Sequence, residues 1–105
     1  MKVEIRHNKD DFTFEIKQDG YPAFDICEGD LGYLVDVFIN PTSIDPQLSL
    51  FETFRVTVHQ RSLILERSSR GESQTLLKLS KSAASKWAER VTCAFGTIFN
   101  SYYRY

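Results

Sequence analysis

The chain has 105 residues, 42% of them apolar and 13% aromatic, which is enough to bury a core and fold as a single domain over residues 1–105 without disulfide bonds. No apolar run reaches the roughly 18 residues of a membrane-spanning helix, and the N-terminus lacks the apolar stretch of a secretory signal, so we expect a cytoplasmic protein. The two cysteines, Cys27 and Cys93, lack the spacing of a metal site, and we expect two separate, buried thiols.

The net charge of −1 is divided unequally along the chain. Residues 1–53 carry four basic and eleven acidic side chains, a net charge of −7, whereas residues 54–105 carry nine basic and three acidic side chains, a net charge of +6. Such a division can give one domain an acidic and a basic surface, which favours oriented association with a charged partner. The alternative is that the two halves interleave in a sheet and their charges cancel.

Three short segments in the first 27 residues have the pattern of half-buried strands. Residues 2–7 and 12–18 alternate apolar and polar side chains, and the polar turn between them predicts a hairpin. A third strand is expected around residues 23–27, after a tight turn at Asp19-Gly20.

The next segment combines glycines, an apolar run and prolines. Residues 28–32 contain two glycines, which predict a loop or a bulged turn. Residues 33–39 are almost continuously apolar, as expected of a central strand that is covered on both faces. Two prolines then predict a long irregular loop over residues 40–48, because each disfavours helix in the residue before it.

The second half of the chain predicts three further strands. They are expected over residues 50–59, 62–68 and 74–80, with a tight turn between the first two and a polar loop around Gly71 between the last two.

The last quarter of the chain, residues 82–104, has the one sustained helical period. Its apolar residues recur at steps of three, four and one, which place them on one stripe of a helix: Ala84, Trp87, Ala88, Val91, Phe95, Ile98 and Tyr102. Ser80 or Ser82 can cap this helix by accepting a hydrogen bond from a free N–H of its first turn. We expect Trp87 to be buried against the strands.

Seven strands followed by one C-terminal helix that carries a tryptophan, here Trp87, resemble the pleckstrin-homology superfold. The resemblance covers the whole chain and implies an α+β fold, in which a seven-stranded, bent antiparallel sheet of barrel or sandwich form is closed by one C-terminal α-helix. Many domains of that superfold bind phosphoinositides through basic residues in and after their first loop. Here that loop is residues 7–11 (HNKDD), whose two aspartates would repel phosphate, so we expect no specific phosphoinositide binding.

Few side chains have the pattern of a catalytic or metal site. The two histidines, His7 and His59, have no cysteine or second histidine at ligand spacing. Four acidic residues surround the glycine-containing segment: Asp25, Glu28, Asp30 and Asp36. They lack the alternation of a calcium loop, and we interpret them as a solvated acidic turn. Since the glycines also form no phosphate cradle, we expect no enzyme, no metal and no cofactor.

Basic residues on the predicted hairpins are the first candidates for a partner-binding surface: Arg55, Arg61, Arg67, Arg70 and Lys78. If they converge, they form a patch suited to phosphate or to an acidic protein. A sequence pI of about 6.1, and the absence of a strand that interleaves aromatic and basic residues, argue against nucleic acid as the partner.

Aromatic residues at the end of the predicted helix are the second candidates: Phe99, Tyr102, Tyr103 and Tyr105. They widen the apolar face beyond what one helix on one sheet needs. Tyrosine and arginine are enriched at protein interfaces, so we expect a docking site or a homodimer contact through the C-terminal helix. The alternative is that a deeply curved sheet wraps around the helix.

The function that we expect is therefore that of a non-enzymatic protein-interaction domain, which binds a protein partner through its charged surface and aromatic C-terminal helix. The alternative is a stand-alone inhibitor or immunity-type protein of a phage or mobile element, similar to anti-CRISPR proteins, which would act by occluding a functional site of its partner.

Overall fold

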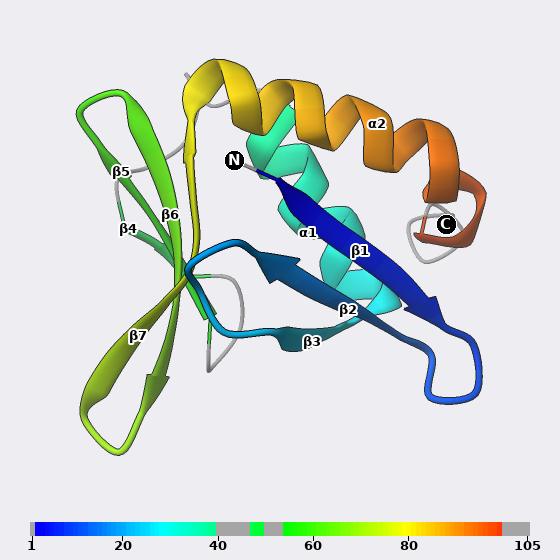
Figure 1. Ribbon diagram of the computed structural model, residues 1–105, viewed down its shortest axis with the longest axis horizontal. Helices are drawn as coiled ribbons and strands as arrows, with labels where there is room; N and C mark the ends of the chain where they lie inside the picture. The colour runs from blue at the N-terminus through cyan, green and yellow to red at the C-terminus, as the bar shows by residue number, and fades with distance from the viewer. Residues whose placement is uncertain (1, 40–46, 50–53, 100–105) are drawn as a thin grey trace.

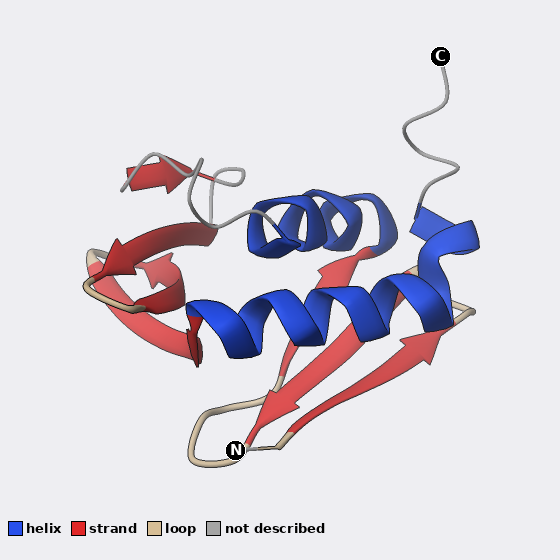
Figure 2. Ribbon diagram, turned by 90° about the horizontal axis from the view of Figure 1, so that it is seen from above, coloured by secondary structure: helices blue, strands red, loops and turns tan. Residues whose placement is uncertain are grey.

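The structure, a computed structural model, describes residues 2–39, 47–49 and 54–99. These ranges form seven strands and two helices: β1 (Val3–Asn8), β2 (Thr13–Gln18), β3 (Phe24–Cys27), α1 (Glu28–Ile39), β4 (Gln47–Ser49), β5 (Phe54–His59), β6 (Ser62–Ser69), β7 (Glu72–Ser80) and α2 (Lys81–Phe99). The strands form two separate antiparallel sheets, one of β1–β2–β3 and one of β4–β5–β6–β7 (Figure 1). The two helices lie side by side, and the strands of the first sheet run along one side of α2 (Figure 2).

The expected single seven-stranded sheet closed by one helix is wrong. The strands are divided between two sheets, and the expected loop and central strand over residues 28–39 are instead the helix α1. A helical period was present in this segment, since four residues spaced three, one and three apart are buried: Leu31, Leu34, Val35 and Phe38. A short apolar run is compatible with both periods, and the elements that pack around it decide which one forms.

Other sequence predictions are confirmed. The first two strands form an antiparallel hairpin, with Val3 opposite Gln18 and Asn8 opposite Thr13. The hydroxyl of Ser80 accepts a hydrogen bond from the N–H of Ala83 at 3.2 Å and so caps the start of α2. Residues 100–104 of the expected helix, and most of the expected loop over residues 40–48, lie outside the described residues.

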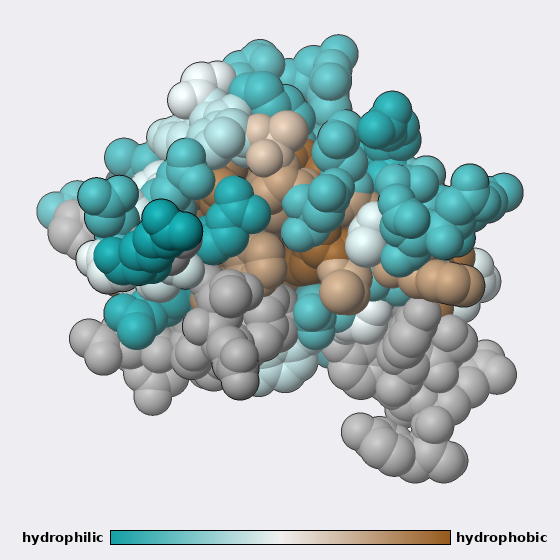
Figure 3. All heavy atoms as spheres, turned by 90° about the horizontal axis from the view of Figure 1, so that it is seen from below, coloured by the Kyte–Doolittle hydropathy of each residue, from teal (hydrophilic) through white to brown (hydrophobic). Residues whose placement is uncertain are grey.

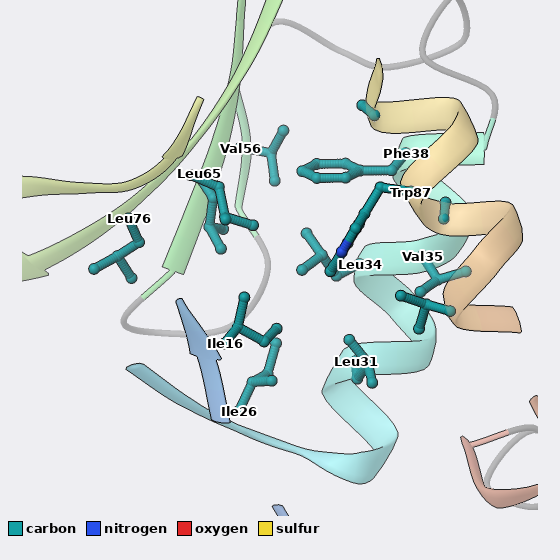
Figure 4. Packing of buried hydrophobic residues seen from close by; sticks show 14 of the residues in the cluster. Ile16, Ile26, Leu31, Leu34, Val35, Phe38, Val56, Leu65, Leu76 and Trp87 are labelled. Carbon is teal, nitrogen blue, oxygen red and sulfur yellow. The ribbon is translucent and has the colours of Figure 1, made fainter. Parts of the chain in front are cut away.

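The core lies where the two sheets and the two helices meet (Figure 4). Ile26 of the first sheet, Val56 of the second sheet and Leu34 of α1 all point into it. Trp87 is 3% exposed, as expected, and its ring centroid lies 5.8 Å from that of Phe38. The tryptophan therefore joins α2 to α1 as well as to the strands.

Two further sequence expectations concern the cysteines and membrane-spanning helices. Cys27 and Cys93 are both exposed, so the prediction of two buried thiols is wrong. None of the helices in the described ranges has the length and apolarity to span a bilayer.

Candidate functional site

The candidate basic residues do not form one patch. Arg61 lies in the turn that precedes β6, whereas Arg67 and Arg70 lie at the other end of this strand. Five residues of β6 lie between Arg61 and Arg67, which corresponds to about 20 Å of extended strand and exceeds two Debye lengths at physiological salt. Arg55 and Lys78 are exposed on β5 and β7, where Arg55 stands opposite the acidic Glu66.

Arg67 and Arg70 line a depression of about 590 Å³ at the β6–β7 turn, together with Glu72, Ser73 and Gln74. All of these residues belong to one hairpin, and all but Arg67 are exposed. The carboxylate of Glu72 shares the depression and offsets part of the positive charge. The hairpin therefore lacks the concentrated, buried positive charge of a phosphate site.

The aromatic candidates cannot be placed in the same way. Phe99 is the last residue of α2, and Tyr102, Tyr103 and Tyr105, like the side chain of Phe99, lie outside the described residues. Docking or dimerisation through this end of the chain stays a prediction.

The exposed large apolar side chains within the described ranges are dispersed. Phe12 is 66% exposed in the β1–β2 turn, while Tyr33 and Ile39 are about 40% exposed and lie roughly 120° apart around the axis of α1. On the face drawn in Figure 3, apolar side chains reach the surface in the centre, with hydrophilic side chains above them and on both sides. These three residues do not make one continuous docking face.

The four acidic residues near the glycines do not gather into a metal site. Asp25 and Asp36 are exposed on different elements, and Glu28 is buried. Within the described ranges, no group of three or more potential ligands could hold a metal ion. Asp30 lies in the first turn of α1, where partial burial raises the pKa of its carboxyl above the ordinary value.

His7 and Glu28 form a hydrogen-bonded pair that the sequence did not predict. Glu28 Oε2 lies 2.6 Å from His7 Nε2, and both side chains are largely buried. The imidazole also stacks on Phe14, with ring centroids 4.5 Å apart, and lies beside Phe95 at 6.2 Å. No hydroxyl or thiol of the described residues is bonded to this imidazole, so we interpret the pair as a structural tie between the end of β1 and the start of α1.

A cleft of about 250 Å³ lies between β1 and α2. One wall consists of Val3 and Ile5 of β1. The other wall consists of α2 residues at steps of three and one, which form one stripe of the helix: Trp87, Arg90, Val91, Ala94 and Phe95. The cleft is smaller than the roughly 300–1,000 Å³ of sites that hold drug-sized ligands, so it fits one or two side chains of a larger partner.

Arg90 is the charged member of this lining. It is exposed on α2, and no ion pair among the described residues includes it. The basic residues on the outer face of β1 differ in this respect, because Lys2 lies 3.6 Å from Glu4 and Arg6 lies 3.2 Å from Glu15. Arg90 therefore places a positive charge beside an apolar wall, without a charged partner in the part of the chain that the structure describes.

β1 is an edge strand of its sheet, and its free edge borders the cleft. The N–H of Asp19 donates to the C=O of Lys2 at 3.3 Å, which makes these opposite residues a hydrogen-bonded pair. Hydrogen-bonded and non-bonded pairs alternate in an antiparallel ladder, so Val3, Ile5 and His7 direct their N–H and C=O groups away from β2. Nothing in the described part of the chain pairs with these outward groups.

Sequence reasoning found the two walls of the cleft but not the cleft. The stripe of α2 and the alternation of β1 were both recognised as apolar faces and assigned to the core. The edge position of β1 depends on the division of the strands into two sheets, and no local sequence pattern predicts that division.

No family model, curated protein or solved structure matches the chain. The resemblance to the pleckstrin-homology superfold therefore has no relative to test it, and the single closed sheet that it implied is wrong for this chain.

Proposed function

We propose that the chain is a protein-interaction domain that binds a short segment of a partner protein in the cleft between β1 and α2. The observation that carries the proposal is the apolar cleft itself, with Arg90, which has no ion pair among the described residues, in its lining, and with the edge of β1 beside it, which no described strand pairs with. An apolar side chain of the partner would pack against Val3, Val91 and Phe95. A carboxylate next to it in the partner would approach Arg90.

The size of the cleft limits what it can do alone. Burial of one aliphatic side chain contributes about 1.5–3 kcal/mol. A dissociation constant of about 1 µM requires roughly 8 kcal/mol, so the cleft must act together with neighbouring contacts. The partner segment therefore has to extend beyond the cleft along the molecule.

Selection of peptides on the folded domain tests this proposal. Twelve-residue peptides from a random phage-displayed library would be selected on the immobilised domain, and their affinities would be measured by fluorescence. Trp87 is the single tryptophan of the chain and lines the cleft, so its emission reports binding there.

Two variants of α2 locate the binding site. Ala94 is exposed and lines the cleft, whereas Thr97 is exposed on the same helix outside the cleft. We expect Ala94→Glu to weaken binding of the selected peptides at least tenfold and Thr97→Glu to leave it unchanged. A selection without binders, or peptides that bind both variants equally well, would contradict the proposal.

A further inference from the structure

We infer that the partner segment binds as an extended strand added to the free edge of β1, with an acidic side chain at Arg90. This inference rests on the proposed function and specifies the conformation and chemistry of the segment.

The outer backbone groups of β1 match those of an added strand. Val3, Ile5 and His7 each direct one donor and one acceptor away from β2, at every second residue over about 13 Å. An extended peptide presents its own donors and acceptors with the same two-residue spacing. Main-chain pairing of this kind supplies affinity, while pockets for alternate side chains supply specificity.

The side chains of β1 determine which side chains of an added strand would enter the cleft. Val3 and Ile5, whose backbone groups face outward, also line the cleft with their side chains. In a strand added beside them, every second side chain lies on the same face of the sheet and points toward α2. The segment should therefore alternate apolar residues, which enter the cleft, with polar residues, which face solvent.

The space beside β1 favours a single strand over larger occupants. α2 runs beyond the β1 edge of the sheet (Figure 1), and residues of both elements line the cleft of about 250 Å³. A neighbouring strand needs about 4.8 Å of lateral room, whereas a helix has a diameter of about 10–12 Å. A second copy of the domain would bring its own α2 to the same edge, so it fits this position less well than a peptide does.

The charge of the lining favours an acidic residue in the partner segment. Arg90 is the cationic residue of the cleft and has no ion pair among the described residues. Arginine binds carboxylates through a fork of N–H donors. An aspartate or glutamate next to the apolar residues of the segment would satisfy it.

N-methylation of the selected peptides tests strand addition without a change in the protein. Methylation removes one backbone N–H at a time. We expect losses of about tenfold or more at every second residue of the central segment and small effects at the residues between them.

Amide hydrogen exchange of the domain provides an independent readout. On addition of a selected peptide, the amides of Val3, Ile5 and His7 should become protected. The amides of Glu4 and Arg6 bond to β2 in the free domain and serve as internal controls, because their protection should change little.

Arg90→Ala tests the acidic residue, with Lys86→Ala as a control at an exposed position of α2 outside the cleft. We expect Arg90→Ala to weaken binding about threefold to fivefold at low salt, and less at high salt, while Lys86→Ala has no effect. Selected peptides without an acidic residue, or equal effects of the two variants, would contradict the assignment of Arg90.

The outcomes separate the inference from the proposed function. If Ala94→Glu abolishes binding but N-methylation shows no period of two, the partner does not bind as a strand, although the cleft still binds it. If Ala94→Glu leaves binding intact, the cleft is not the site and the proposed function itself is wrong.

Discussion

The side chain of Gln18 in β2 makes two hydrogen bonds to the backbone of Lys78 in β7. Its Nε2 donates to the C=O of Lys78 at 2.9 Å, and its Oε1 accepts from the N–H of Lys78 at 2.8 Å. Gln18 is fully buried. β2 and β7 belong to different sheets. At their junction, the Gln18 amide pairs with the backbone N–H and C=O of Lys78, as the backbone of a neighbouring strand would do within a sheet.

Replacement of Gln18 by leucine should destabilise the domain by about 2–4 kcal/mol, because it leaves two partly buried backbone groups of Lys78 without their partner. Urea unfolding would measure the loss as a lower midpoint, with the dependence of the unfolding free energy on urea concentration unchanged. Gln74 is exposed on β7, and Gln74→Leu serves as a control that should stay within about 0.5 kcal/mol of the parent. An unchanged midpoint for Gln18→Leu would show that the sheets are held together by apolar packing alone.

Replacement of Trp87 by alanine should cost about 3–5 kcal/mol, because it leaves a cavity between α2 and α1. Replacement of Trp87 by phenylalanine should lower the free energy of unfolding by no more than about half as much as replacement by alanine. Phenylalanine fills most of the space, and it also removes the indole N–H, a buried donor without a partner in the described part of the chain. Thermal unfolding followed by circular dichroism would measure both variants. A phenylalanine variant as unstable as the alanine variant would show that the indole N–H has a partner.

Phe12 should be a site where substitution stabilises the domain. Its φ angle is +56°, a left-handed conformation that costs a residue with a Cβ about 1–2 kcal/mol, and its ring is too exposed to offset this cost by burial. Asparagine tolerates this conformation, so Phe12→Asn should raise the free energy of unfolding by about 0.5–1 kcal/mol. Phe12→Val, which adds a β-branch, should lower it. Urea unfolding that gives the opposite order would show that the Phe12 ring stabilises the fold.

Association with DNA or with phosphoinositide liposomes should be weak and should vanish by about 0.2 M salt. The candidate arginines lie at opposite ends of β6, so a phosphate group meets one or two of them and not a cluster. Co-sedimentation with liposomes and fluorescence anisotropy with labelled DNA would measure binding. Micromolar affinity that survives this salt concentration would mean that the basic residues act together.

The elements predicted correctly from the sequence are those with an unbroken period. The hairpin of β1 and β2 alternates without interruption, and the apolar stripe of α2 continues over several turns. In α1, by contrast, Gly29 and Gly32 are poor helix formers, and the apolar residues that follow match a buried strand equally well. Burial against α2 and both sheets selects the helix, and this information is not local to residues 28–39.

The candidate site was harder to predict than the fold, because it depends on an edge. A strand has the same alternation whether its outer backbone groups are paired or free. Val3 and Ile5 therefore give the same signal in the middle of a sheet and at its margin. Only the division into two sheets, bridged by Gln18 and Lys78, leaves β1 with β2 as its single neighbour among the described strands.

The same division has a consequence for the order in which the chain folds. Each sheet consists of strands that follow one another in the sequence, so its hairpins form by closing short loops. The bond between Gln18 and Lys78 joins residues 60 positions apart, and α2 follows β7 directly. Pairings of such high sequence separation are costly in chain entropy and slow. We therefore expect the two meanders to form first and the folding rate to be set by their docking at this junction.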